Sequence, residues 1–151
     1  MAPRSTVFSD HELSYLAGQR LGRLGTVAAD SSPQNSPVGF QVRPDGIVEI
    51  YGYNLGASRK LRNVAATGVV SLVVDDIASV APWKVRGVEI RGTVAAATDI
   101  DPPQTWLSRE VIQIHPRRIL PGARPRSRRR AGPHHTGRHQ NGALRSGTGR
   151  I

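Results

Sequence analysis

Apolar and polar residues alternate along several short stretches of the chain, and this pattern predicts a mainly β protein. Between Val88 and Val94, apolar residues and a glycine alternate with polar residues, so one face of a long strand would be buried. Short turns join the first three apolar stretches, which favours antiparallel pairing. We expect six strands, at 21–28, 34–42, 47–51, 69–74, 84–97 and 111–120.

Two prolines and one β-branched run refine this picture. Pro37 removes a ladder hydrogen bond, so strand 34–42 is expected to be bulged or irregular near its middle. Pro116 confines its part of the last strand to an edge or a bulge. The run 69–74 is almost continuously apolar, which predicts a central strand with both faces covered.

Capping signals predict two short helices. Ser9 and Glu12 have the spacing of a capping box, so a helix is expected at about 10–17. A second helix is expected at about 58–66, with Ser58 as its N-cap and Gly68 at its end.

The second helix carries an unusual charge pattern. Arg59, Lys60 and Arg62 lie in its opening turns, where the helix dipole is already positive. Each exposed cation costs about 0.3–1 kcal/mol there. A bound anion would reverse that sign, because free N–H groups and cationic side chains would converge on it. We interpret the segment as a phosphate-binding helix start; a solvated basic face beside an ordinary cap is the alternative.

Charge divides the 151 residues into two parts. The chain has a net charge of +10, but residues 121–151 contain eight arginines and no acid, which leaves 13 basic and 11 acidic residues over 1–120. We therefore expect one globular domain at 1–120 and a disordered, Arg/Gly/Pro/His-rich tail at 121–151. The absence of cysteine, of a long apolar run and of a signal-like start favours a cytoplasmic protein without a membrane segment.

No metal site is expected. Asp75 and Asp76 are adjacent, but no further ligand lies at a suitable spacing, so a turn at a strand end is the preferred interpretation. His134, His135 and His139 in the tail could bind a metal only weakly.

Several motifs in order resemble those of the pyridoxamine 5′-phosphate oxidase-like split-barrel flavoproteins. They are Gly-Arg-Leu-Gly-Thr-Val, Gln-Asn-Ser-Pro-Val-Gly-Phe, Ala-Ser-Arg-Lys-Leu-Arg-Asn-Val, Val-Ser-Leu-Val-Val-Asp-Asp-Ile, Gly-Val-Glu-Ile-Arg-Gly and Ile-His-Pro-Arg-Arg-Ile. The resemblance covers about 7–120 and is greatest to the actinobacterial branch that uses the deazaflavin coenzyme F-420. It implies a six-stranded antiparallel split β-barrel with small peripheral helices, assembled as a homodimer with cofactor sites at the subunit interface.

The resemblance also implies site residues. The cofactor phosphate would lie at the loop after the third strand and the following helix start, and the ring would lie against the second strand. The partner subunit would contribute from the region 83–86. The implied residues are Asn54, Ser58, Arg59 and Lys60 for the phosphate; Ser36, Pro37, Val38 and Gly39 for the ring; and Trp83 and Arg86 from the partner. Structural alternatives remain, since Pro37 could only shape a bulge and Trp83 could only fill the dimer core.

The resemblance implies hydride transfer from the reduced deazaflavin to an electron-poor small molecule. No catalytic residue is identified, and Tyr51 and Tyr53 are weak candidates for a proton donor. Arg59 and Lys60 cannot distinguish F-420 from FMN, so an FMN-dependent oxidoreductase is an alternative. Tetrapyrrole or small-molecule binding without turnover is another. Nucleic-acid binding through the tail is a third, and deleting 121–151 would abolish it while sparing cofactor binding.

The tail departs from the pattern of these proteins, which often end soon after the last strand with a Trp-Gly-containing finish. Its composition is typical of GC-rich DNA translated out of frame, and our hypothesis is that a frameshift produced it. An intact reading frame at the sequenced locus, with relatives carrying the same tail, would exclude that origin.

Overall fold

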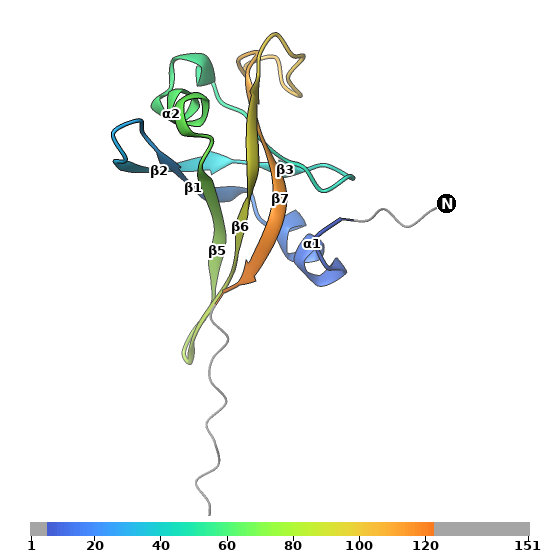
Figure 1. The fold of residues 1–151 in the computed structure, drawn as a ribbon. Helices are drawn as coiled ribbons and strands as arrows, with labels where there is room; N and C mark the ends of the chain where they lie inside the picture. The colour runs from blue at the N-terminus through green and yellow to red at the C-terminus, as the bar shows by residue number, and fades with distance from the viewer. Residues whose placement is uncertain (1–5, 123–151) are drawn as a thin grey trace, which may run out of the picture.

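The computed structural model describes residues 6–122, and the tail predicted at 121–151 lies outside the described residues from 123 onward, with its three histidines. The fold is mainly β, and every strand pair is antiparallel (Figure 1). The elements are α1 (Asp10–Ala17), β1 (Leu21–Val27), β2 (Pro33–Gly39), β3 (Gln41–Val42), β4 (Val48–Ile50), the 3-10 helix η1 (Leu55–Ala57), α2 (Arg59–Thr67), β5 (Val70–Val80), β6 (Trp83–Ala97) and β7 (Val111–Pro121).

The strands form one curled sheet in the order β2-β1-β5-β6-β7-β4-β3. Its two edge strands, β2 and β3, are consecutive in the chain and are separated only by Phe40. The expected count of six strands is therefore wrong, because the strand predicted at 34–42 is divided at Phe40 and the sheet has seven. β2 pairs with β1 and β3 pairs with β4, so the chain leaves one edge of the sheet and joins the other.

The two prolines behave differently from one another. Pro37 lies opposite Arg23 in an unbroken register, so there is no bulge at this residue, and the irregularity of the stretch 34–42 is the break at Phe40. β2 is an edge strand, where a missing N–H costs no internal ladder bond. Pro116 lies at a register shift between β6 and β7, which confirms the bulge expected for it. Gly92 faces this bulge so closely that a Cβ would lie 2.0 Å from the His115 carbonyl oxygen.

The core occupies the inside of the curled sheet. Its fully buried side chains include Leu24, Leu72, Ile90 and Ile114, contributed by four adjacent strands. β5 is central, as expected, but only its alternate residues are buried, and Val73 is half-buried. Among residues 6–122 no layer packs on the outer face of β5, so the prediction that both of its faces are covered is wrong for this part of the chain.

The helices begin where their caps predict. The Ser9–Glu12 capping box is present at α1, and Ser58 accepts a hydrogen bond from the Leu61 N–H at the start of α2. Gly68 ends α2 with a left-handed φ of 65°, which glycine adopts at little cost. The two helices lie on opposite sides of strands β5, β6 and β7 in Figure 1, and each buries a residue in the same core, Leu16 from α1 and Val64 from α2. Neither helix has the length and apolarity that spanning a membrane requires, as judged over residues 6–122.

Candidate functional site

A cleft of about 440 Å³ opens at the junction between β2 and β3. It brings together the chain around the strand break, the loop after β4, the first turn of α2 and the loop before β7. The lining residues are Pro37, Val38, Gly39, Phe40, Gln41, Tyr51, Gly52, Tyr53, Lys60, Trp106 and Leu107.

Buried and partly buried hydrogen bonds hold α2 against β1 and β2, and β2 borders this cleft. The side-chain amide of Asn63, 5% exposed, donates to Thr26 Oγ1 at 3.0 Å and to Gln34 Oε1 at 3.2 Å. Thr67 Oγ1 donates to the Val27 carbonyl at 2.7 Å. These bonds come from successive turns of one helix face, so they fix both the position and the rotation of α2.

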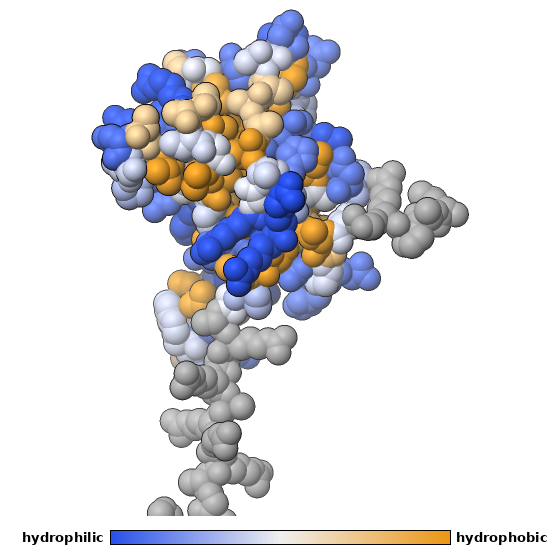
Figure 2. Space-filling view, viewed as in Figure 1, coloured by the Kyte–Doolittle hydropathy of each residue, from blue (hydrophilic) through white to orange (hydrophobic). Residues whose placement is uncertain are grey.

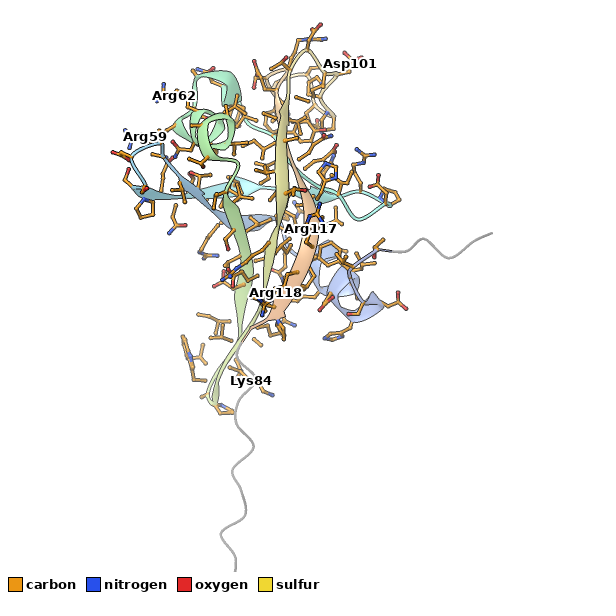
Figure 3. All side chains as sticks on the ribbon, viewed as in Figure 1. Arg59, Arg62, Lys84, Asp101, Arg117 and Arg118 are labelled. Carbon is orange, nitrogen blue, oxygen red and sulfur yellow. The ribbon has the colours of Figure 1, made fainter. Side chains whose placement is uncertain are left out.

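The rotation of α2 separates its three cations. Lys60 is half-buried and lines the cleft, whereas Arg59 and Arg62 are exposed. Figure 3 shows Arg59 and Arg62 on the outer side of the helix. The first turn of α2 contains no acidic residue. The end of the cleft beside Lys60 is therefore electropositive, because the cation and the helix dipole have the same sign there.

Two exposed aromatic rings flank the cleft. Tyr53 and Trp106 have ring centroids 4.9 Å apart, and they are 78% and 54% exposed. Ser108 fixes the loop that carries Trp106, because its hydroxyl donates to the Gly52 carbonyl and accepts from the Leu55 N–H. Apolar surface also gathers over the upper body in Figure 2. An exposed aromatic pair at a cleft suits the binding of a planar ligand by stacking.

A buried carboxylate lies behind the opposite wall of the cleft. Glu49, in the middle of β4, is 8% exposed and accepts hydrogen bonds from Gln41, Tyr51 and Gln113. Burial raises the pKa of Glu49. The three hydrogen bonds and Arg43 together lower it by more, so the net pKa lies below its ordinary value. Burial, together with the hydrogen bond to Glu49, raises the pKa of Tyr51. At neutral pH the pair is therefore a carboxylate and a neutral phenol.

The sequence profile described as pyridoxamine 5′-phosphate oxidase matches residues 8–135. The chain belongs to this family. A relative from Streptomyces rimosus, named 5a,11a-dehydrotetracycline/5a,11a-dehydrooxytetracycline reductase, is 44% identical over 115 residues, which is 75% of this chain and 81% of the relative.

Solved structures support the same fold. A protein described as an F420 reductase superimposes with a TM-score of 0.58 at 21% identity, over 75% of this chain and 98% of its own. HupZ from Group A Streptococcus superimposes with a TM-score of 0.62 at 17% identity, over 76% of this chain and 94% of its own. At such identities the likeness concerns the fold alone.

The residues expected at the cofactor site of this family member fall into two groups. Pro37, Val38, Gly39 and Lys60 line one cleft, although 20 or more residues separate Lys60 from the other three. Ser36 instead borders a second concavity, formed by β1, β2 and β5, and its Oγ is buried without a hydrogen-bond partner among residues 6–122.

The other expected phosphate ligands do not line the cleft. Asn54 is exposed and precedes η1 without a side-chain capping bond. The Ser58 hydroxyl donates to the Leu55 carbonyl at 2.6 Å and also caps α2, so its hydrogen-bonding capacity serves the local fold. Arg59 points to solvent from the outer side of the helix.

The two residues expected from a partner subunit lie on the hairpin of β5 and β6. Trp83 is 65% exposed near its tip. Arg86 donates to Asp76 through Nε at 3.0 Å, and its guanidinium lies 5.4 Å from the centre of the Tyr15 ring. Burial and Asp76 raise the pKa of Tyr15 to about 12. Within one chain, neither Trp83 nor Arg86 lines the cleft.

Asp75 and Asp76 lie in the middle of β5 and pair with β6, so the strand-end turn expected there is wrong. Asp75 is ion-paired with Arg23, and Asp76 with Arg86. Within residues 6–122, no group of three metal-ligating side chains is present.

Sequence reasoning missed the far wall of the cleft and the Tyr53–Trp106 pair. Gln41 and Gln113 meet Glu49 only through strand pairing, and 64 residues separate Gln113 from Glu49. Trp106 lies in a poorly patterned loop, so no local periodicity placed it beside Tyr53. The single available signal was Glu49 itself, an acid within an otherwise apolar stretch at 47–51.

Proposed function

We propose that this protein is a deazaflavin (coenzyme F-420)-dependent reductase that transfers a hydride to a small, electron-poor acceptor. One observation carries the proposal: strand residues 37–39 and Lys60 line the same cleft, beside an exposed aromatic pair. The family membership and the reductase name of the 44% identical relative support an oxidoreductase.

The residues at the α2 end of the cleft suit an anionic group such as a phosphate. Lys60 supplies a cationic donor, and the first N–H groups of a helix have no partner within the helix. No acid in the first turn of α2 opposes the anion. When bound, the reduced cofactor would supply the hydride, and the protein would supply orientation and exclusion of water.

Each part of the cleft would have its own task. Lys60 would bind the anionic end of the cofactor. The wall formed by Pro37, Val38 and Gly39 would position a planar ring, and Tyr53 with Trp106 would shield it from water. Tyr51 is unsuited to proton donation, because its proton is held by Glu49 and its pKa is raised. We assign no catalytic acid.

The relative suggests the chemical class of the acceptor. Its name describes reduction of a dehydro form of a polycyclic compound. By analogy, the acceptor here would be a polycyclic molecule in which a carbon–carbon double bond is polarised by a carbonyl group. The exposed Tyr53–Trp106 pair suits such a flat molecule.

We also propose that the protein acts as a homodimer, with the β5–β6 hairpin contributing to the partner's site. The exposure of Trp83 at 65% and of Val80 at 74% supports this, because large apolar side chains are otherwise seldom left uncovered together. Light scattering would test it: a mass of one chain, 16.3 kDa, would exclude the dimer.

The function is tested by titrating the purified protein with F-420 and, in parallel, with FMN, following quenching of tryptophan fluorescence. Trp106 lines the cleft and should report on either cofactor. Tighter binding of F-420 than of FMN would support the proposal. A preference for FMN would retain the family and change the cofactor, since Lys60 and α2 recognise a phosphate in either. Binding of neither would refute a cofactor-dependent reductase.

A further inference from the structure

Glu49 occupies the centre of a row of polar side chains across three strands. In the register of the sheet, Gln41 of β3 and Gln113 of β7 lie directly opposite it on either side. Gln41 Nε2 donates to Glu49 Oε2 at 2.8 Å, and Gln113 Nε2 donates to Oε1 at 3.2 Å. Tyr51, two residues further along the same strand face, donates its hydroxyl proton to Oε2 at 3.1 Å.

The charge of Glu49 dictates the direction of these bonds. An ionised carboxylate can only accept hydrogen bonds, so each neighbour must turn a proton toward it. The Arg43 guanidinium lies 3.6 Å from Glu49 Oε1 and 2.8 Å from Asp45 Oδ2. Glu49 is therefore a carboxylate beside a cation that also pairs with a second acid. Glu49 itself does not line the cleft, whereas Gln41 and Tyr51 do.

The consequence is clearest for Tyr51, because a phenol has a single proton. With that proton directed at Glu49, the Tyr51 oxygen has only lone pairs left for a molecule in the cleft. Gln41 still presents its carbonyl oxygen, and one of its two amide protons is committed to Glu49. This wall therefore favours ligands that donate hydrogen bonds and disfavours anions.

We infer that Glu49 determines ligand specificity: by holding the Tyr51 proton, it makes the phenol oxygen an acceptor that recognises a hydroxyl or N–H group of the bound molecule. The inference rests on the proposed function only in taking this cleft as the ligand site. With Lys60 attracting anions at the α2 end, the two ends of the cleft have opposite preferences. A ligand bearing an anionic group and a hydroxyl group would then bind in one orientation.

The experiment uses a matched pair of flat probes, 2,6-dihydroxynaphthalene and its dimethyl ether. Both can accept hydrogen bonds, but only the diol can donate them. Dissociation constants would be measured on the full chain, labelled with nitrogen-15, from the shift of the Trp106 indole N–H signal. The signal would be assigned with the Trp106→Phe variant.

Wild-type protein is expected to bind the diol about fivefold more tightly than the ether, the effect of one neutral hydrogen bond. Tyr51→Phe should abolish this preference. Glu49→Gln should also abolish it, because a glutamine amide can donate to the Tyr51 oxygen and thereby release the phenol proton toward the cleft, where either probe can accept it. A purely structural role would instead weaken both probes together. Tyr53→Phe, which alters a tyrosine of the same cleft without a bond to Glu49, should retain the wild-type ratio.

Equal binding of the two probes by wild type would overturn the inference, as would a diol preference that survives in Tyr51→Phe. Failure of both probes to bind would also overturn it. Circular dichroism would establish that each variant is folded, and Tyr51→Phe keeps the test decisive if Glu49→Gln unfolds. F-420 titration of the same samples separates the two proposals. If wild-type protein does not bind F-420, the proposed reductase function is refuted. If it binds F-420 but does not distinguish the two probes, only the role of Glu49 is refuted.

Discussion

Replacing Lys60 with alanine tests the proposed phosphate site most directly. Lys60 is half-buried and is the one cation of α2 that lines the cleft. A hydrogen bond from an ionised donor contributes about 1.5–3 kcal/mol, which corresponds to a loss of about 10- to 150-fold in affinity. We expect the lower half of this range, because the ammonium group retains contact with water.

Arg62→Ala provides a matched control on the same helix. It removes the same charge two residues further along, from the exposed outer side of α2. Its effect on cofactor affinity should be below about twofold and should vanish with added salt, because only screened, long-range attraction is lost. Either substitution removes a cation from the positive end of the helix dipole, so neither should lower the free energy of unfolding.

The assay is fluorescence titration with F-420 at low and high salt, accompanied by thermal unfolding of each variant. Equal affinities for wild type and Lys60→Ala would refute the phosphate site. If Lys60→Ala and Arg62→Ala lost the same amount of cofactor affinity at low salt, and neither lost any at high salt, the helix would attract the cofactor only through its overall charge. The geometry of the cleft would then have no part in phosphate recognition.

Three further predictions concern the framework of the site. Gly92→Ala should lower the free energy of unfolding by about 3 kcal/mol or more, because its Cβ would overlap the His115 carbonyl oxygen; a urea midpoint like that of wild type would contradict this. Asn63→Ala should cost about 1–3 kcal/mol by leaving the buried Thr26 hydroxyl without its donor, and chemical denaturation with Thr26→Ala and the double variant would measure the coupling. Because folding lowers the pKa of Glu49, its ionised form stabilises the protein above the ordinary carboxyl pKa, and this contribution is lost as the pH falls through the folded pKa. The stability advantage of wild type over Glu49→Gln should therefore shrink on acidification, and an advantage independent of pH would exclude an ionised Glu49.

The elements whose signals are local followed from the sequence. Ser9 and Glu12 predicted α1, and Ser58 with Gly68 bounded α2 to within one residue, because capping depends on contacts within one helical turn. The alternation around Val88 predicted β6 for the same reason, since side chains of a strand alternate between faces whatever its neighbours are.

Strand pairing and the far side of the cleft depended on tertiary structure. The sequence predicted one strand at 34–42, but the division at Phe40 arises because β2 and β3 pair with different neighbours, β1 and β4. Local propensity describes one segment at a time and does not specify which neighbour it pairs with, so it cannot signal such a transfer. The charge pattern of α2 identified its cations in advance, but only the hydrogen bonds of Asn63 determine which of them turns toward the cleft.

The Glu49 row shows the same division. Sequence alone placed an acid in an apolar strand, and burial of a charge is costly unless partners satisfy it. The partners come from β3 and β7, which lie beside β4 only because those strands pair with it. The sequence thus determined which segments are helix or strand and where charge accumulates. The fold determined which polar and charged side chains come into contact, because these contacts depend on strand pairing that no local pattern encodes.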